Sequence, residues 1–502
     1  MNASEMFYWT VEKLTGAKKE EAFRTISCFF TLFFLLISYY MLKALRNSEF
    51  HSVFPPDWEP VSFLVTVFLS LGVTQIFNHF FDRIDMHRML RYTYITVISC
   101  KVLLFVLLST GAKWPVILFY FFGTVYFLLC IAVTWGSINF LFNPEQSKRC
   151  YGFIASGTMF GATAGTLITE LFLSMQWRHE LLLGSGAFLS LAMLFAHLSK
   201  RGLEEWTLRE PMSKTPSQGL RIIREIKELM GHKFVRCIGI MVFALAVSNT
   251  VMNFQTRRAM DRSMCHNTFL EVYSVWNPAE LTLKDSGFEL IYGAKLRGSD
   301  LRTEEVEKFL RLHGLSIGAD EFMSLHAKYR ERLAFNYLSF WNSILKWVSI
   351  LGLFLLIFCA RFIFKIFGVR FASLVLPCFS LVGLIFLLGS PDLFSIQILL
   401  ILAMSMDYSL NNATKEVFYT PTSPQTKGKY KPIIEGPLMR LGDFSAAVTR
   451  ILCIALVPLA MQSWVYVGFG ISIVLVWILA VWYAGTVFQK RESEDGPRFV
   501  IP

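Results

Sequence analysis

Charged residues are embedded in apolar sequence between Asn411 and Asp443. This stretch carries Lys415 and Glu416 inside an apolar segment, passes through a polar loop, and returns to apolar sequence that contains Arg440 and Asp443. At membrane depth a charged side chain costs about 2.5–3.5 kcal/mol, so it normally faces a partner or a water-filled path. We therefore interpret the stretch as the chemistry of a transport site and the rest of the chain as its scaffold.

The composition is that of an integral membrane protein. Of the 502 residues, 54% are hydrophobic and only 17% are charged, and 48 are Phe, well beyond an ordinary soluble domain. The net charge of +11 comes from Lys and Arg in short segments between apolar runs. Membrane topology explains this distribution better than nucleic-acid binding does. We expect a lipid bilayer and no nucleic acid as partner.

Twelve apolar windows are each long enough to cross a bilayer, which takes roughly 20 residues. They form two groups of six, which predicts an all-α fold with a 6+6 arrangement. The windows lie near 24–44, 60–80, 92–112, 114–142, 151–175 and 180–199, then near 234–254, 335–360, 370–390, 393–414, 437–461 and 464–487. We accordingly expect a cytoplasmic N-terminus (1–23), a first bundle (24–199), a basic linker (200–233), a second bundle (234–487) and a cytoplasmic tail (488–502).

The connections between windows alternate in positive charge. Every second connection is rich in Lys and Arg, and those between them hold few. The rich segments carry, among others, Arg83, Arg88 and Arg91, then Lys148 and Arg149, then Lys427, Lys429 and Lys431. The positive-inside rule then predicts both termini in the cytoplasm.

A polar insertion, residues 257–333, interrupts the second group of windows. By the same parity it falls outside. It contains LRTEEVEKFLRLHGL and ADEFMSLHAKYRERLAF, in which apolar residues recur with helical spacing. We expect a small, mostly helical external subdomain, and its partner, if it has one, is not specified by these residues.

Lys43 and Arg46 stand near the outer end of the first window. They are three residues apart and so share one helical face. Two interpretations stay open. Both side chains would extend to the outer membrane interface, or they would attract an anionic substrate, since the positive-inside rule makes cations at this end unusual.

The fifth window contains GTMFGATAG, with Gly157, Gly161 and Gly165 at four-residue spacing. Such a face permits close backbone approach to another helix, which serves either plain packing or a sliding surface. Isolated charges at Lys101, Glu170, Lys346 and Arg450 are either internal ion pairs or site residues, and the sequence does not choose their partners.

Motifs of catalysis are absent from the sequence. There is no G-x-x-x-x-G-K-[ST] phosphate loop, no H-E-x-x-H and no G-x-S-x-G. We expect no catalytic residue, no metal site and no cofactor, and thus not an enzyme.

The stretch from Asn411 to Asp443, called the motif stretch below, resembles the ATP/ADP translocase family of plastids and obligate intracellular bacteria. The resemblance rests on T-K-E-V-F-Y-T-P at 414–421, K-G-K at 427–429 and R-L-G at 440–442, with W-G-S at 135–137, K-R-C-Y-G at 148–152 and S-N-T-V at 248–251 in support. It implies a twelve-span fold similar to the major facilitator type and exchange of ATP for ADP. It also implies a bacterial inner membrane as the location.

Three regions of the chain depart from the family pattern. Where family members have R-D-x-K-D, this chain has Lys43-Ala44-Leu45-Arg46-Asn47, and the usually acidic positions before K-R-x-Y and in the seventh span hold Gln146 and Met252. These departures bear on ATP/ADP specificity more than on the fold.

The resemblance implies a set of substrate-binding residues. Cations from both halves would hold the phosphates, with acidic residues pairing with them in the empty carrier and a lysine-rich loop acting as a gate. The substrate-binding set is Lys43, Arg46, Lys415, Glu416, Arg440 and Asp443, and the gate set is Lys427, Lys429 and Lys431. The alternatives are a proton-coupled importer of other nucleotides or of a nucleotide cofactor, and a transporter-derived receptor or scaffold.

Overall fold

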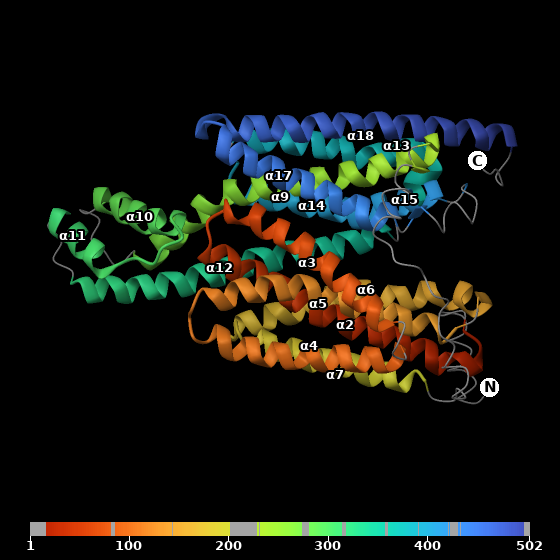
Figure 1. Ribbon diagram of the computed structural model, residues 1–502, viewed down its shortest axis with the longest axis horizontal. Coiled ribbons are helices and arrows are strands. Elements are labelled where there is room, and N and C mark those ends of the chain that lie inside the picture. The colour runs from red at the N-terminus through yellow and green to blue at the C-terminus, as the bar shows by residue number, and fades with distance from the viewer. Residues whose placement is uncertain are drawn as a thin grey trace. The chain divides into compact units, whose positions relative to one another are not determined.

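Long apolar helices dominate the structure, a computed structural model (Figure 1). It describes residues 17–81, 86–142, 144–200, 228–229, 231–273, 281–313, 318–356, 360–389, 391–419, 421, 430–431 and 433–495. Most of the expected linker 200–233 lies outside the described residues. So do Lys427 and Lys429, residues 1–16 of the expected N-terminal segment and residues 496–502 of the tail.

The helices follow one another with short connections. The first group is α2 (Lys19–Val53), α3 (Trp58–Phe81), α4 (Met86–Leu108), α5 (Trp114–Asn139), α6 (Pro144–Ser174) and α7 (Leu181–Leu198). The second is α9 (Lys233–Val272), α10 (Leu281–Leu296), α11 (Thr303–His313), α12 (Ala319–Phe354), α13 (Ala360–Phe386), η4 (Leu387–Gly389), α14 (Leu393–Met406), η5 (Asp407–Asn411), α15 (Asn412–Tyr419), η6 (Ile434–Leu438), α17 (Met439–Leu456) and α18 (Leu459–Asp495).

Helices are the structure that this composition requires, because a helix satisfies its own backbone hydrogen bonds where no water is available. Within the described residues, eight helical segments are long and apolar enough to span a membrane. The other four expected windows coincide with α3, α6, α12 and α17, which are also helical. Of these, α17 carries Arg440, Asp443 and Arg450 along its 18 residues. The chain is therefore a multi-pass membrane protein.

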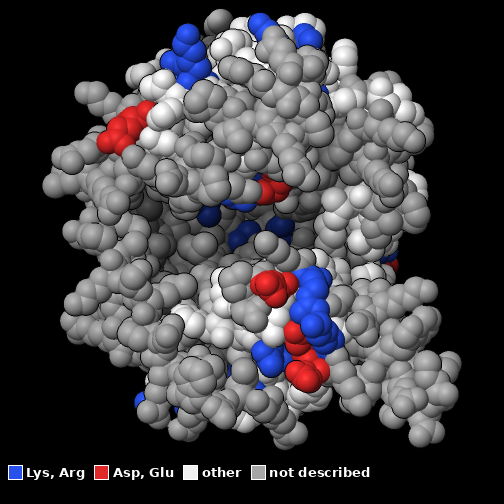
Figure 2. Space-filling model, turned by 90° about the vertical axis from the view of Figure 1, so that its right-hand side faces the viewer, with Lys and Arg blue, Asp and Glu red and all other residues white. Residues whose placement is uncertain are grey.

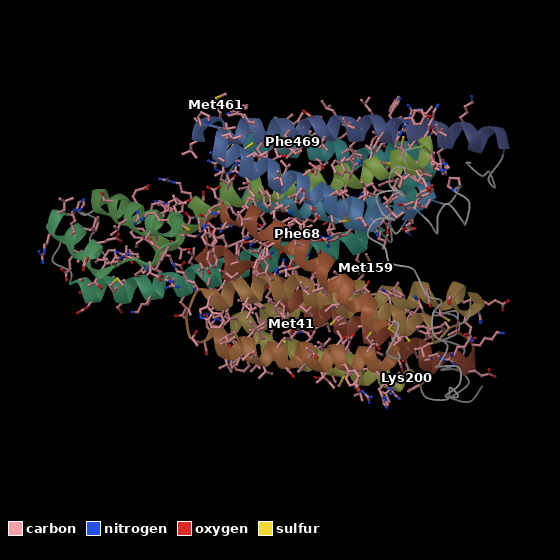
Figure 3. The ribbon with its side chains drawn as sticks, in the orientation of Figure 1. Met41, Phe68, Met159, Lys200, Met461 and Phe469 are labelled. Carbon is pink, nitrogen blue, oxygen red and sulfur yellow. The ribbon has the colours of Figure 1, made fainter. Side chains whose placement is uncertain are left out.

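Contacts divide the chain into two units. Unit 1 contains Met1–Val53, Phe68–Lys214 and Ala334–Ser349. Within it, α2 is the central helix, packing against α5, α6 and α7. Its most apolar window is 61% buried, against 28–39% for those of α4, α5 and α7, and Met41 on α2 is fully buried (Figure 3).

Unit 2 contains Phe54–Val67, Thr215–Leu333 and Ile350–Pro502. Here α9 is the central helix, in contact with α13, α17 and α18. Its most apolar window is 78% buried. The outward faces of α18 leave large apolar side chains exposed, such as Leu479 and Trp464, as expected of a surface solvated by lipid.

The insertion is helical and packs on the end of α9. Figure 1 shows α10 and α11 past the end of the apolar helices of unit 2. Its core is aromatic: the rings of Phe269 on α9 and Tyr273 just after α9 stack with centroids 4.4 Å apart, and Phe288 and Tyr329 lie against Phe269. Burial alone raises the pKa of the Tyr273 phenol, so this tyrosine stays neutral at physiological pH.

The glycines of α6 lie directly on the backbone of α2. A Cβ atom added at Gly157, Gly161 or Gly165 would come 2.6, 2.3 or 2.9 Å from the carbonyl oxygen of Phe29, Phe33 or Ile37. Contacts this short leave no room for a side chain. The sequence predicted that this helix face lies close to another helix, and in the structure that helix is α2. The face positions α2, which carries Lys43 and Arg46.

We expect Gly161→Ala to destabilise the protein, because its new methyl group meets a backbone oxygen that cannot rotate away. Overpacking of this kind costs about 1–3 kcal/mol. The measurement is unfolding in mixed micelles of rising denaturing-detergent content. Gly152→Ala in the same helix is the matched control, since nothing lies within 4 Å of a Cβ there. Equal stability of the two variants would contradict the prediction.

Candidate substrate site

Two π-helical turns in unit 2 precede the two charged parts of the motif stretch. Helix α14 continues through the π turn η5 into α15, which carries Lys415 and Glu416, and the π turn η6 leads into α17 with Arg440 and Asp443. Each π turn adds a residue to the helical turn, changes the direction of the side chains that follow, and is frequent at functional sites.

Lys415 pairs with Glu435 of η6. The distance between Lys415 Nζ and Glu435 Oε1 is 3.1 Å, and the side chains are 19% and 30% exposed. Among the described residues Lys415 makes no hydrogen bond, and Glu435 Oε1 is buried and accepts none. Coulomb attraction therefore holds this pair together, and the ammonium donors remain available for another acceptor.

Arg440 pairs with Asp443 on the next turn of α17. Arg440 Nη1 lies 3.1 Å from Asp443 Oδ2, and Asp443 Oδ1 accepts a hydrogen bond of 2.9 Å from the Thr250 hydroxyl of α9. This bond needs α17 close to α9. Gly442 permits that, since a Cβ there would lie 2.6 Å from the Phe243 carbonyl oxygen. Arg440 stays 35% exposed.

Asp407 is a third carboxylate in this network. Its two oxygens accept hydrogen bonds of 3.0 Å from the side-chain amides of Asn249 on α9 and Asn411 on η5. Two amide donors satisfy a carboxylate without neutralising it. Asp407, Asn249 and Thr250 thus connect the central helix α9 to both halves of the motif stretch.

Glu416 pairs with the loop residue Lys431, at 2.5 Å between Oε1 and Nζ. We expected Glu416 to pair with the substrate-binding cations. In the structure its partner is instead Lys431, a residue of the expected gate. The reason is geometric, because consecutive residues of a helix project about 100° apart. Lys415 and Glu416 therefore reach different neighbours. Lys431 also lies over the Tyr419 ring, 5.3 Å from its centroid.

In unit 1, Arg46 is held by neutral groups. It donates to the Thr124 hydroxyl of α5 at 2.8 Å and to the side-chain oxygen Oδ1 of Asn47 at 2.9 and 3.1 Å, and its guanidinium lies 5.3 Å from the Tyr120 ring centroid. Among the described residues no carboxylate pairs with it. Lys43, one turn earlier, lies 5.5 Å from the Tyr40 ring centroid.

The isolated charges found in the sequence have partners in the structure. Lys346 of α12 forms an ion pair with Glu170 of α6 at 2.8 Å, and Arg450 of α17 pairs with Asp57 at 3.2 Å. Lys101 is fully buried and donates to the hydroxyls of Ser38 and Ser185, each at 2.7 Å. These interactions join different helices within a unit, or in the case of Asp57 a helix and the turn before α3, and they require no substrate.

The structure therefore brings Lys415, Arg440 and Asp443 into one polar network of unit 2 and places Lys43 and Arg46 on α2 of unit 1. Sequence reasoning missed Asp407 and Glu435 as members of that network. Both had a signal, since each is an acidic residue in a largely apolar stretch. Figure 2 shows one face of the molecule, on part of which Lys and Arg side chains lie beside those of Asp and Glu.

A double-mutant cycle tests the Lys415–Glu435 ion pair. We expect Lys415→Met and Glu435→Gln each to destabilise by about 1–3 kcal/mol, because each leaves its partner's charge without compensation. The double variant should be more stable than the two effects added together, by roughly 0.5–3 kcal/mol. Unfolding in mixed micelles measures all four proteins. Strict additivity would mean that the two side chains do not interact.

Residues 393–488 match the family model of the TLC ATP/ADP transporters, and this segment includes both π turns and Lys415, Arg440 and Asp443. No curated protein sequence matches the chain significantly.

Solved structures share the fold over most of the chain. The crystal structure of the nucleoside transporter NupG is similar with a TM-score of 0.50 and 10% identity, over 91% of this chain and 98% of that one. The POT family transporter PepTSo is similar with a TM-score of 0.51 and 12% identity, over 92% and 98%. At these identities the likeness concerns the fold alone. It confirms the predicted twelve-helix, major-facilitator-like membrane architecture. The resemblance seen in the sequence is confirmed as a family-model match: residues 393–488 are similar to the TLC ATP/ADP transporter model.

Proposed function

We propose that the protein exchanges nucleotides across a membrane, ATP for ADP, by alternating access. The observation that carries this proposal is the pairing of Lys415 with Glu435 and of Arg440 with Asp443, inside the segment that matches the TLC family model. Both cations lie in or next to membrane-spanning helices, and both keep part of their surface exposed. One carboxylate stabilises each cation in the fold, and the exposed part of each cation is accessible to another anion.

Phosphate oxygens fit these cations chemically. A nucleoside triphosphate presents several anionic oxygens, which accept hydrogen bonds from ammonium and guanidinium groups more strongly than neutral acceptors do. When phosphate binds, Lys415 exchanges Glu435 for a phosphate oxygen, and Arg440 exchanges Asp443 in the same way. Asp443 retains its hydrogen bond from Thr250, so it is not left without a partner. The carboxylates keep the cations stable in the empty carrier.

Arg46 supplies the reason for exchange rather than one-way movement. Its described partners, Asn47 and Thr124, are neutral, so its charge is uncompensated until an anion binds. An uncompensated charge is costly at membrane depth, which disfavours reorientation of the empty carrier. A bound nucleotide removes this penalty in both directions of transport.

The location and the domain limits belong to the same proposal. The alternation of Lys- and Arg-rich connections supports cytoplasmic termini, and the family supports a bacterial inner membrane. The boundaries 24–199 and 234–487 for the two bundles, the gate formed by Lys427, Lys429 and Lys431, and the external position of residues 257–333 remain predictions.

One observation favours a proton-coupled importer as a second candidate. Asp407 lies within a membrane-spanning helix, and its hydrogen-bond partners are the amides of Asn249 and Asn411. A carboxylate so placed can take up and release a proton during transport. The neutral Gln146 and Met252 at positions that are acidic in the family point the same way, because they alter the charge balance of the carrier.

Uptake of labelled ATP into liposomes that contain the purified protein tests the proposed function. We expect uptake when the lumen holds ADP and little uptake when it is empty. Uptake into empty liposomes that grows with an inward proton gradient would instead establish the importer. Absence of uptake with every loaded nucleotide would favour the receptor or scaffold alternative.

The role of Lys415 is tested by Lys415→Ala. We expect ATP/ADP exchange to fall about 10- to 100-fold, the factor for a lost hydrogen bond between charged groups, while most of the protein still folds. Lys308→Ala, at an exposed lysine of α11 in the insertion, is the matched control and should leave exchange unchanged. A parallel loss of folded protein and of exchange in Lys415→Ala would argue that the residue is only structural.

A further inference from the structure

A cavity between α4 and α7 in unit 1 is unrelated to the motif stretch. It measures about 400 Å³ and lies where the first turns of α4 pack beside the last turns of α7. Its lining includes Arg88 and Arg91 from α4, and Met193, Leu194 and His197 from α7, with Lys200 just beyond the end of α7 (Figure 3). Arg88, Arg91 and Leu194 are exposed, so the cavity opens to the surface.

The charged side chains that line this cavity are cations. Arg88 and Arg91 are three residues apart on one face of α4, and among the described residues neither has a carboxylate partner. Lys200 adds a further cation from the opposite wall. Arg88 and Arg91 differ in this respect from Lys415 and Arg440 of unit 2, which are paired with acidic residues. The helix N-terminus of α4 adds a smaller favourable field for an anion.

The rest of the lining is apolar and faces outward. Leu194 is 49% exposed, and Leu191 one turn earlier on α7 is also exposed. Tyr92, beside Arg91, is 55% exposed, and an amphipathic tyrosine in such a position is typical of the membrane–water interface. The cavity therefore has a cationic end next to an apolar surface of a membrane-spanning helix.

We propose that this cavity binds an anionic phospholipid. The phosphate lies among Arg88, Arg91 and Lys200, and an acyl chain lies along Met193 and Leu194. A soluble anion would leave the apolar wall unused, and a zwitterionic lipid would bring a positive headgroup toward three cations. Basic pockets between membrane helices bind anionic headgroups for the same reason. Because the lipid touches both α4 and α7, it stabilises the packing of these two helices.

The test is lipid retention by the full-length protein in detergent, measured by native mass spectrometry. Phosphatidylglycerol and phosphatidylcholine with identical acyl chains compete for the wild-type protein, with and without inorganic phosphate. We expect phosphatidylglycerol to be preferred. The double variant Arg88→Gln, Arg91→Gln should lose about 30-fold of that preference, the factor for two cations near a lipid surface. The matched control is Lys308→Gln, Arg311→Gln, two cations at the same spacing on exposed α11.

Each outcome decides the proposal. Equal retention of the two lipids by the wild type would overturn it, as would an unchanged preference in the double Gln variant. Displacement of phosphatidylglycerol by inorganic phosphate would assign the cavity to a soluble anion instead. If the Gln variant does not fold, Arg88→Lys, Arg91→Lys replaces it, and this variant must keep the preference because it keeps both charges.

Discussion

The energetic cost of charge inside a membrane governs this protein. A cation or carboxylate on a spanning helix needs a partner, and the structure supplies one from the same helix or from another element. In unit 2 the partners are carboxylates, Glu435 for Lys415 and Asp443 for Arg440. In unit 1 they are neutral, with Thr124 and Asn47 for Arg46 and two serines for Lys101. The two units thus stabilise charge in different ways, and the proposed exchange depends on that difference.

Close helix packing makes these partnerships possible. Each unit has one buried central helix, α2 or α9, and each central helix carries polar residues of the candidate site. Glycines on the neighbouring helices, Gly161 on α6 and Gly442 on α17, bring a backbone against the central one. A side chain at either position would separate the helices. For α17 this would break the short bond between Thr250 and Asp443, so packing and chemistry are coupled at that point.

Cations serve different purposes at different positions in this chain. Those of the motif stretch are paired and partly buried, and we assign them to substrate. Those between α4 and α7 are exposed and lie beside an apolar surface, and we assign them to lipid. Lys346 and Arg450 join helices through ion pairs with Glu170 and Asp57. Residues of the same type therefore have different roles because the burial of each side chain and the residues around it differ.

Sequence alone determined the class of fold, and it predicted the region of the candidate site. Helix length, apolar content and the embedded charges of residues 411–443 are local properties of the sequence. In a bilayer, length and apolar content determine which segments span the membrane, and each embedded charge has an energetic cost. The motifs likewise predicted the family whose model matches residues 393–488. Only the tertiary structure decided the partners: Glu435 rather than Glu416 for Lys415, Thr250 for Asp443, Asn249 for Asp407, and Ser38 with Ser185 for Lys101. These pairs depend on which helices are neighbours and on the direction in which each π turn points the residues after it. The spacing of residues within one segment predicts neither the neighbouring helices nor these side-chain directions.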